Sequence, residues 1–524
     1  MKIMQIDNPQ DSADIIYNIA AEYCDFFQDQ NGDTYLVSCI DNKYDLKYLS
    51  NSDDIKTFLT QLHFDEQNQT AKPYAIKTAY DNIVAIGSVN PEKMPVYTRV
   101  AIHEDTLYYD LCNDDGEVVV IDEDNVGISY LNTVEDLFFR KDNMMNEQLK
   151  PIRNSKYKLL DFIEEFFNVD EDLKLLLAVY ICVAFVPLID HPILIVEGEK
   201  GSGKTTFLRH IGAILNPTKK GVLTLPTNKS DLVTTLNNNY FAPFDNVGKI
   251  SDEFANVFCQ ASTGGTMTKR KLFTDNTEYP IDFKRLVALD GINMGIAQSD
   301  LLDRAIFIRL KRFEDDEYIP LQFVTKHFNQ CLPFALGDIF RILSKALKIL
   351  PSVNLKTCDR MGDFMLYGYA VAEAIKKGYG QKFCDDYKMN RKLSDKAVIE
   401  DNPLLDALEF FADKHDYWRG KPSDLLKLLQ QSFNEKYGYF SSDLMREHPN
   451  TMSRKFGDYT HEIKGMGIKL KNGRDTDRYI EIKRIGANAP TKSSISTIND
   501  ENKTKNRKSL LDEDDEFDED LRKK

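Results

Sequence analysis

Gly198-Glu-Lys-Gly-Ser-Gly-Lys-Thr205 gives the clearest indication of how this 524-residue chain folds. It fits the pattern G-x-x-x-x-G-K-[ST], in which glycines let backbone N–H groups turn inward around a phosphate. An apolar run, PILIV, precedes the loop, and an amphipathic stretch, TTFLRHIGAIL, follows it. This order predicts a buried parallel strand, a phosphate loop and a helix whose positive end points at the anion.

The loop itself suggests which of its residues bind which part of ATP. Lys204 is expected to reach the β- and γ-phosphates, and Thr205 is expected to give its hydroxyl to Mg²⁺. The residues predicted to surround the nucleotide are Gly198, Glu199, Lys200, Gly201, Ser202, Gly203, Lys204, Thr205 and Thr206.

A second acidic group is expected on a neighbouring strand. The apolar run at 240–244 ends in Asp245-Asn246, and an apolar strand that ends in an acid predicts a second Mg²⁺ site residue, here Asp245. A glutamate commonly follows as the base that orients the attacking water, but this chain has Asn246. Either the base comes from Asp252 or Glu253, or hydrolysis is slow.

Polar residues also flank the next two predicted strands, after the first and before the second. The run RLVALD ends at Asp290, and Asn293 lies just beyond it; either side chain is placed to sense the γ-phosphate. The segment SDLLD then leads to Arg304, directly before the strand-like run IFIRL. Spacing leaves two interpretations of Arg304 open: a finger that stabilises the transferring phosphoryl group, or the partner of Asp300 or Asp303 in a surface ion pair.

Composition and periodicity divide the rest of the chain. TYLVSCI reads as a strand near the start, and the segment at about 106–131 reads as a meander of short strands joined by Asp, Asn and Gly turns. The tail loses its apolar residues and becomes acidic, which suits either a solubilising tail or a hook for partner proteins anchored by Phe517 and Leu521. We expect a mixed α/β domain of unknown role at 1–150, the ATPase core at 155–317, a helical region at 318–402, a separate unit at 403–487 and a disordered acidic tail at 488–524.

The unit at 403–487 reads as helices followed by a hairpin, the order of a winged helix. One helix is NPLLDALEFFADKH, a second begins after Lys421, and a third begins near Pro449 with Asn450 or Thr451 as its cap. Two strands around a glycine-bearing turn then complete the pattern. Residues 446–484 carry ten basic and six acidic side chains, a net of about +4.

A local excess of positive charge suits duplex DNA. The alternative is a winged helix that serves only protein contacts. In the DNA-binding interpretation, the third helix enters the major groove and the wing contacts the backbone. The expected contacts are Ser453, Arg454 and Lys455 from the helix, and Lys471, Arg474 and Arg478 from the wing.

Bulk properties narrow the class of protein. A net charge of -16 argues against a uniformly basic surface, so any nucleic-acid contact must come from a local patch or a pore. The eight cysteines are scattered without a Cys-x-x-Cys pair, which indicates reduced thiols in the cytoplasm rather than a zinc site or a disulfide framework. The start has no signal-peptide pattern, and the longest apolar run, at 175–189, is shorter than the roughly 20 residues of a membrane span. We expect it to be a buried helix.

These motifs together resemble a known family. The set GEKGSGKTT, YFAPFDNVGKIS, ASTGGTMTKRKLFTD, LVALDGIN, SDLLDR and CDRMGDF, in this order, resembles the AAA+ helicases of phages and mobile elements. Within that group it resembles the replicative helicases of staphylococcal chromosome cassettes and the Rep initiators of staphylococcal pathogenicity islands, which are MCM-like or superfamily 3-like, hexameric and self-loading. With VYTRVAIHEDTLYYDL included, the likeness covers residues from about 95 to 487.

The resemblance implies further roles. Lys204 and Thr205 correspond to Walker A, and Asp245 and Asn246 to Walker B. Arg304 would act as a finger on the ATP of a neighbouring subunit. Arg360, which opens a helix of the lid, would be sensor 2.

Two further assignments come from the resemblance. Relatives often carry asparagine where this chain has Asp290, so sensor 1 stays open between Asp290 and Asn293. A hairpin from about Lys269 to Lys284 would line a central channel and touch single-stranded DNA. Its basic residues are Lys269, Arg270 and Lys271.

The expected fold is therefore a multidomain α/β protein: an AAA+ P-loop core with a parallel sheet and a helical lid, an N-terminal α/β domain and a C-terminal winged helix. The expected function is that of an ATP- and Mg²⁺-dependent DNA helicase and replication initiator of a mobile genetic element, a hexamer that moves on single-stranded DNA. The alternative is a switch in which ATP gates DNA binding without unwinding. A primase-helicase fusion is disfavoured, because the N-terminal region shows no clear carboxylate cluster or zinc ribbon.

Overall fold

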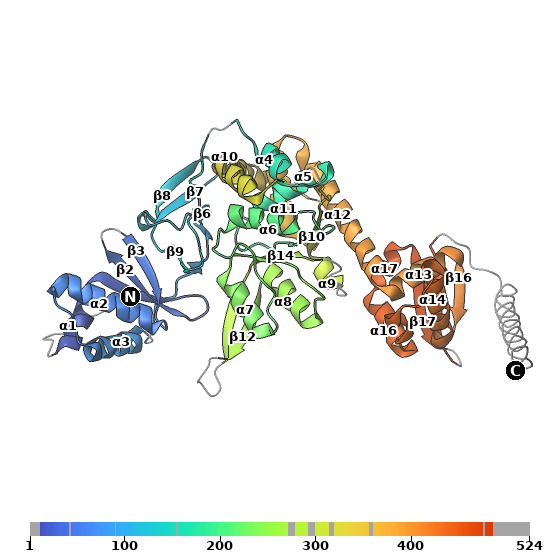
Figure 1. Ribbon diagram of the computed structural model, residues 1–524, viewed down its shortest axis with the longest axis horizontal. Coiled ribbons are helices and arrows are strands. Elements are labelled where there is room, and N and C mark those ends of the chain that lie inside the picture. The colour runs from blue at the N-terminus through green and yellow to red at the C-terminus, as the bar shows by residue number, and fades with distance from the viewer. Residues whose placement is uncertain are drawn as a thin grey trace, which may run out of the picture. The chain divides into compact units, whose positions relative to one another are not determined.

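The computed structural model divides the chain into two compact units, Met1–Ser394 and Asp395–Lys524. It describes residues 11–40, 43–87, 89, 91–153, 156–270, 278–291, 299–313, 319–355, 360–474 and 477–485. Parallel and antiparallel sheets occur together with many helices, which confirms a multidomain α/β protein (Figure 1). The expected boundaries of the five regions stay predictions, and the acidic tail lies outside the described residues.

The first part of unit 1 is the antiparallel sheet β1-β2-β3 packed with helices. Asp11 caps the first helix, because its carboxylate accepts hydrogen bonds from the N–H groups of Ala13 and Asp14. The expected strand TYLVSCI is confirmed as β2. The elements are α1 (Ser12–Tyr23), β1 (Cys24–Gln28), β2 (Thr34–Ile40), β3 (Lys43–Tyr48), α2 (Ser52–Gln67) and α3 (Pro73–Gly87).

The expected meander at 106–131 is confirmed as part of the antiparallel sheet β5-β6-β7-β8. Alternate residues face opposite sides: Tyr109 and Val119 join the core shared with the helices of the central region, whereas Tyr108 and Val118 pack on Phe139. The strands are β5 (Val100–His103), β6 (Thr106–Asp110), β7 (Glu117–Ile121) and β8 (Val126–Tyr130), beside the parallel pair β4 (Val96–Tyr97) and β9 (Phe138–Phe139).

A buried arginine ties this antiparallel sheet to the central region. Arg99 is fully buried, and its guanidinium donates to the carbonyl oxygens of Asp110, Asn146 and Pro217 at 3.1, 2.7 and 3.2 Å. Its Nε also donates to Asn216 Oδ1 at 3.1 Å. A buried charge this well supplied with acceptors fixes several segments of chain at once.

The centre of unit 1 is a parallel sheet of order β11-β14-β10-β15. Helix α6 lies on one face of this sheet and α8 on the other (Figure 1). The first face shares a core with α5 and α6. On the second face, Phe258 of α8 contacts Phe244, with ring centroids 5.7 Å apart. The expected strands at 192–196, 240–244 and 285–290, and the strand expected directly after Arg304, are confirmed. The elements are α4 (Leu159–Phe166), α5 (Glu171–Val183), β10 (Ile193–Glu197), α6 (Lys204–Leu215), α7 (Lys229–Asn238), β11 (Phe241–Phe244), α8 (Asp252–Thr263), β14 (Leu286–Asp290), α9 (Ser299–Leu302) and β15 (Ala305–Arg309).

The expected hairpin is present between β11 and β14. β12 (Gly265–Arg270) pairs antiparallel with β13 (Glu278–Phe283), so the hairpin begins four residues earlier than the expected Lys269. Lys284 follows β13, and its Nζ donates to Asp190 Oδ1 at 2.8 Å and to the Leu188 carbonyl at 2.9 Å. These contacts anchor the base of the hairpin to the loop before β10.

Helices follow the parallel sheet, as expected for 318–402. Pro333 lies inside the first of them, and its carbonyl accepts from the N–H of Ile152 at 2.9 Å. Gly337, one turn on, has no room for a side chain, because a Cβ there would stand 2.0 Å from the Ile152 carbonyl oxygen. The helices are α10 (Leu321–Ile349), α11 (Gly362–Ile375) and α12 (Tyr379–Asp401), and α12 runs across the division between the units.

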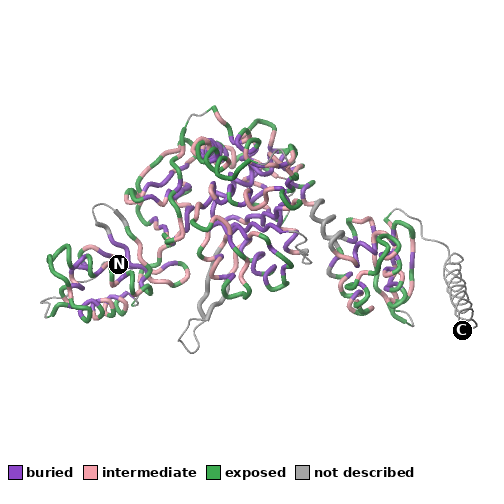
Figure 2. Tube along the Cα trace, in the orientation of Figure 1, coloured by how far each residue is buried: buried purple, intermediate pink, exposed green. Residues whose placement is uncertain are grey.

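The apolar run expected to form a core helix is buried, as is much of the central part of the chain (Figure 2). Every residue from Leu175 to Val186 is buried, and α5 covers most of that stretch. Of the helices in the described ranges, none combines the length and the apolar character that a membrane span requires.

Unit 2 combines the expected helices and hairpin with one strand that the sequence did not indicate. β16 pairs with β18, which gives a sheet of order β16-β18-β17. The expected caps of the third helix were wrong: α16 begins at Pro449, with His448 at the cap position, because proline is favoured in the first turn. The elements are α13 (Pro403–Lys414), β16 (Tyr417–Gly420), α14 (Pro422–Tyr437), α15 (Ser442–Met445), α16 (Pro449–Asp458), α17 (Thr460–Gly465), β17 (Ile468–Arg474) and β18 (Arg478–Arg484).

Candidate functional site

The glycine loop, residues 198–203, joins the carboxyl end of β10 to the start of α6. Gly201 and Gly203 have φ of 87° and 85°, a left-handed conformation that glycine adopts without strain. A Cβ on Gly198 would stand 2.4 Å from Ser202 Oγ. The loop therefore needs its glycines, and it forms a cradle at the N-terminus of a helix, where backbone N–H groups favour an anion.

Two predicted Mg²⁺ residues, 40 positions apart in sequence, are in contact. Thr205 Oγ1 donates to Asp245 Oδ1 at 2.9 Å. Lys204 lies over the loop, with its Nζ donating to the carbonyl oxygens of Gly198 at 2.7 Å and Glu199 at 3.2 Å. The hydroxyl, the carboxylate and the ammonium fit a nucleotide phosphate with its Mg²⁺.

Asp290 lies beside this group at the end of β14. Its Oδ1 accepts from the Asn246 N–H at 2.6 Å, while its Oδ2 is buried without a hydrogen-bond partner among the described residues. Burial, together with the negative charge of Asp245, raises the pKa of Asp290 to about 6, and the Asn246 N–H and Lys204 oppose that rise. An orphaned buried oxygen at this position fits a missing polar ligand. Asn293, the other candidate for sensor 1, lies outside the described residues.

Asn246 stands where the Walker B pattern usually has glutamate, and the backbone gives a physical reason. Its φ is 55°, in the left-handed region, which asparagine tolerates better than most residues. The two alternative bases, Asp252 and Glu253, are exposed in the first turn of α8.

A cavity of about 500 Å³ opens next to the glycine loop. Its walls are mostly apolar and come from the segment before α5, from α6 and from the start of α10. One wall residue, His210, stacks on Phe328 with ring centroids 4.0 Å apart, and burial lowers its pKa to about 4, so the ring is neutral. An apolar pocket beside a phosphate cradle suits a nucleobase. The residues that line it and that the sequence did not single out include Phe166, Phe167, Asn168, Phe207, Phe313, Ile319 and Val324.

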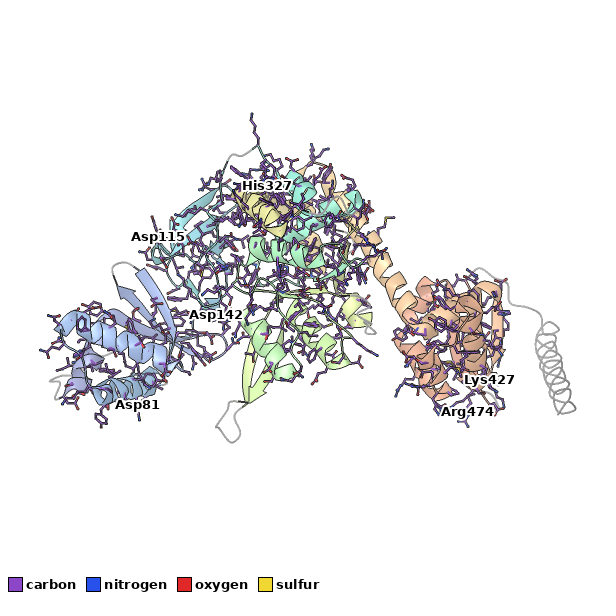
Figure 3. All side chains as sticks on the ribbon, viewed as in Figure 1. Asp81, Asp115, Asp142, His327, Lys427 and Arg474 are labelled. Carbon is purple, nitrogen blue, oxygen red and sulfur yellow. The ribbon has the colours of Figure 1, made fainter. Side chains whose placement is uncertain are left out.

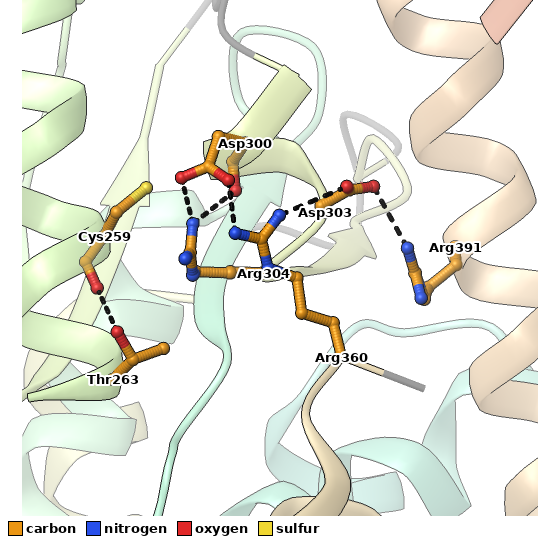
Figure 4. Close-up of polar contacts among 7 residues, drawn as sticks. All are labelled: Cys259, Thr263, Asp300, Asp303, Arg304, Arg360 and Arg391. Atoms are coloured by element: carbon orange, nitrogen blue, oxygen red, sulfur yellow. Dashed lines mark hydrogen bonds and ion pairs between the residues drawn. The ribbon is translucent and has the colours of Figure 1, made fainter. Parts of the chain in front are cut away.

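Arg304 and Arg360 lie together, bound to the same carboxylate (Figure 4). Arg304 Nη1 pairs with Asp300 Oδ2, and Arg360 Nη2 lies 2.5 Å from Asp300 Oδ1. Asp303 extends the network to Arg360 at 3.5 Å and to Arg391 at 3.0 Å. The Nε of Arg304 is buried and has no hydrogen-bond partner in the described part of the chain.

This arginine network lies at the edge of the sheet opposite the glycine loop. The Ile193 N–H, at the amino end of β10, donates to the Arg304 carbonyl at 2.8 Å. The loop begins after Glu197, at the other end of the same strand. A five-residue strand spans about 16 Å, so the backbone of Arg304 lies roughly that far from the loop of its own chain.

The structure places only part of the predicted channel residues. Lys269 and Arg270 occupy the last two positions of β12, opposite Tyr279 and Glu278 of β13. They are therefore next to the connection between β12 and β13, at the end of the hairpin farthest from the parallel sheet. Lys271 lies outside the described residues.

Within unit 2, four of the six predicted DNA contacts line one cavity of about 450 Å³ between α16 and the β17-β18 hairpin. They are Ser453, Arg454, Arg474 and Arg478. Lys455 is instead paired with Glu447, and Lys471 lies on β17 opposite Glu481, away from this cavity.

The cavity also has features that the sequence did not indicate. Tyr479 lines it, and the Arg419 guanidinium of β16 lies 3.8 Å from the centre of that ring. Gly473 makes room for the ring, since a Cβ there would meet it at 2.2 Å. This glycine was expected in the turn of the hairpin but lies inside β17.

Comparison with known proteins gives one family match. Residues 159–379 match the model of the actinomycete integrative conjugative element replication protein family, which is less than half of the chain. A comparison with curated proteins found no match.

Among solved structures, three apo structures of the NrS-1 C-terminal region align with TM-scores of 0.36, 0.38 and 0.39, each at 11% identity. They cover 90 to 92% of this chain and 98 to 100% of theirs. TM-scores this low do not establish a common fold. The family match alone therefore carries the comparison: the central part of the chain is similar to a replication protein of mobile elements.

Proposed function

We propose that this chain is an ATP-dependent DNA helicase and replication initiator of a mobile genetic element, acting as a homo-oligomeric ring, expected to be a hexamer. The observation that carries the proposal is that two clusters of charged side chains lie at opposite edges of one sheet. Lys204 and Asp245 lie at the carboxyl edge, and Arg304 and Arg360 lie at the amino edge. Copies joined edge to edge would place the arginines of one against the glycine loop of the next.

At the carboxyl edge, the residues present would bind ATP in defined ways. The N–H groups of the loop and the Lys204 ammonium would hold the β- and γ-phosphates. Lys204 would then donate to phosphate oxygens instead of the carbonyl oxygens of Gly198 and Glu199. Thr205 and Asp245 would hold Mg²⁺, which neutralises charge on the phosphates during transfer. Asp290 would orient the attacking water through its buried oxygen.

At the amino edge, the arginines would complete a neighbour's site. A positive charge aimed at the transferring phosphoryl group stabilises the charge that develops there. Asp300 would hold Arg304 and Arg360 side by side until that phosphate competes for them. The family match supports a role in mobile-element replication. It covers residues 159–379, which include the residues at both edges of the sheet.

Unit 2 would supply duplex DNA binding through Arg454, Arg474 and Arg478, in the arrangement of a winged helix. The hairpin β12-β13 would contact single-stranded DNA in the ring's channel through the residues next to the connection between its two strands.

A second function is favoured by Asn246, which lacks the carboxylate of the usual base. In this alternative, ATP controls assembly and DNA binding, and no strand is displaced. A forked duplex distinguishes the two: the helicase separates its strands in the presence of ATP and Mg²⁺, whereas the switch binds it and leaves it paired.

The Lys204→Ala variant tests the site itself. It should fold but lose ATP hydrolysis and unwinding, because the lysine carries the contact to the transferring phosphate. Lys345→Ala, an exposed lysine on α10, is the matched control and should keep both activities. Unchanged ATPase activity in Lys204→Ala would refute the proposal for the whole carboxyl edge.

A further inference from the structure

Glu165 of α4 and two residues of α10, His327 and Cys331, bring one donor atom each to within 4.8 Å of one another. Figure 3 labels His327 on α10. His327 Nε2 lies 2.5 Å from Glu165 Oε1, and the other oxygen of that carboxylate accepts a hydrogen bond from the Tyr157 hydroxyl. His327 and Cys331 are four residues apart in one helix, so they share a face. The cluster joins residues that are over 160 positions apart, which explains why cysteine spacing gave no sign of it.

The donor set indicates the class of ion. An imidazole nitrogen, a thiolate sulfur and a carboxylate oxygen are ligands of Zn²⁺, whereas Mg²⁺ and Ca²⁺ prefer oxygen alone. Ligand atoms around a tetrahedral zinc lie about 3.3 to 3.8 Å apart, given bonds of about 2.0 to 2.3 Å. Donor atoms already within 4.8 Å reach that geometry through small side-chain rotations.

We propose that Glu165, His327 and Cys331 form a zinc site that leaves a fourth position for water. Tyr157 belongs to the site as an outer partner, because it bonds the carboxylate oxygen that faces away from His327. Hydrogen bonds of this kind orient a ligating carboxylate.

A surface ion pair between His327 and Glu165 is the competing explanation. Such a pair needs neither Cys331 nor its position on the same face of α10, and it binds no metal. The thiol is therefore the group that separates the two explanations.

Zinc at this position would link two walls of the cavity beside the glycine loop. Glu165 and Phe166 come from α4, and Leu321 and Val324 come from α10. The Phe166 ring already lies 5.2 Å from the His327 ring. Binding would hold α4 and α10 together and raise the unfolding temperature of the full chain, whether or not the chain hydrolyses ATP.

The test uses the full chain, freed of metal and titrated with Co²⁺ as a spectroscopic substitute for Zn²⁺. One equivalent of Co²⁺ should produce the charge-transfer absorption of a cobalt–thiolate bond, and one equivalent of Zn²⁺ should remove it. Cys331→Ser should abolish the absorption, whereas Cys112→Ser, a half-buried cysteine elsewhere, should keep it. His327→Gln should weaken Zn²⁺ binding at least about tenfold. Tyr157→Phe should leave the absorption in place but weaken Zn²⁺ binding by roughly tenfold or more, as loss of an outer hydrogen-bond partner does.

Unfolding temperature without metal checks that each variant folds. His327→Gln changes an exposed side chain, so it remains informative if Cys331→Ser is unstable. Absence of the charge-transfer absorption at one equivalent of Co²⁺ in the unmodified chain would overturn the zinc site. The same absorption in folded Cys331→Ser would overturn it as well.

Discussion

Asp290 is a buried carboxyl group whose ionisation costs stability. Removal from water raises its pKa to about 6, with the nearby Asp245 adding to the effect. Since the folded pKa lies above the unfolded value of 3.8, the folded chain binds this proton more tightly. The contribution of Asp290 to stability is therefore greatest below pH 4 and is lost as the pH rises through 6.

Asp290→Asn should stabilise the chain at neutral pH in the absence of nucleotide. The amide keeps the oxygen that accepts from the Asn246 N–H, but it carries no charge. The expected gain in the free energy of unfolding at pH 7.5 is up to about 3 kcal/mol, and it should shrink as the pH falls through 6 toward 4. ATP hydrolysis should fall, because the carboxylate is lost.

Urea denaturation followed by circular dichroism at pH 7.5 and 4.5 measures this gain. Asp385→Asn, an exposed carboxylate on α12, is the control and should change neither value. A gain of equal size at both pH values would show that charge burial is not the cause.

Single residues at the site could be predicted where the chemistry is local to a motif. Spacing alone predicted that Thr205 and Asp245 serve one ion, and they are in contact. It could not decide between an ion pair and a finger for Arg304. The structure shows the ion pair with Asp300, but the finger depends on a second copy, which no single chain contains. Phe166 and Phe313 were missed because a residue that lines a pocket and a core residue look alike in sequence.

The β12-β13 hairpin carries its basic residues at the end farthest from the sheet. Replacing Lys269, Arg270 and Lys271 by alanine should weaken binding of single-stranded DNA and reduce unwinding before it reduces basal ATP hydrolysis. The reason is that these charges would contact phosphates of the strand rather than the nucleotide. Fluorescence anisotropy with a labelled oligonucleotide, beside an ATPase assay, gives both quantities.

A triple replacement of Lys376, Lys377 and Lys382, on and near the start of α12, removes the same charge elsewhere and serves as the control. If hydrolysis falls while DNA affinity stays, the hairpin serves the nucleotide site instead.

The α16 helix and the β17-β18 hairpin hold four predicted DNA contacts around one cavity. Arg474→Ala should weaken duplex binding and reduce the slope of log affinity against log salt by about 1, because one phosphate contact is lost. Lys427→Ala, on α14 and labelled with Arg474 in Figure 3, should leave that slope unchanged. Equal slopes in the unmodified chain and Arg474→Ala would place the DNA elsewhere.

At the level of elements, periodicity predicted the long helices and the buried strands, since burial imposes a regular apolar pattern. β16 was missed because YWRG is short and owes its strand conformation to pairing with β18, some 60 positions later. The cap of the third helix was missed for a local reason. Asn450 and Thr451 are good caps in general, but Pro449 already begins the helix.

In the proposed ring, each active site would be shared by two copies of the chain. If Arg304 is a finger, Arg304→Ala should reduce hydrolysis about a thousandfold. If it is only part of a surface ion pair, its loss costs at most about 1 kcal/mol of stability and should hardly change the rate of hydrolysis. Mixing Arg304→Ala with Lys204→Ala, each inactive alone, should partly restore ATPase activity. Some junctions would then join an intact loop to an intact arginine.

Co-assembly of the two variants, checked by native mass spectrometry, is the condition for interpreting the mixture. The baseline is the ATPase activity of a mixture in which both differently labelled preparations carry the same variant. No recovery at any ratio, in rings shown to contain both variants, would mean that Arg304 does not act across the junction.

The buried position of Arg99 has a consequence for synthesis of the chain. Its acceptors at Asn216 and Pro217 leave the ribosome more than 110 residues after it does, and Phe340, which packs on the neighbouring Tyr109, leaves later still. At about 5 to 20 residues per second, the guanidinium waits roughly 6 to 24 seconds for those acceptors. During that interval the β5-β6-β7-β8 sheet exposes an apolar face to water. The emerging N-terminal third should therefore be a substrate for chaperones until the central region has been translated.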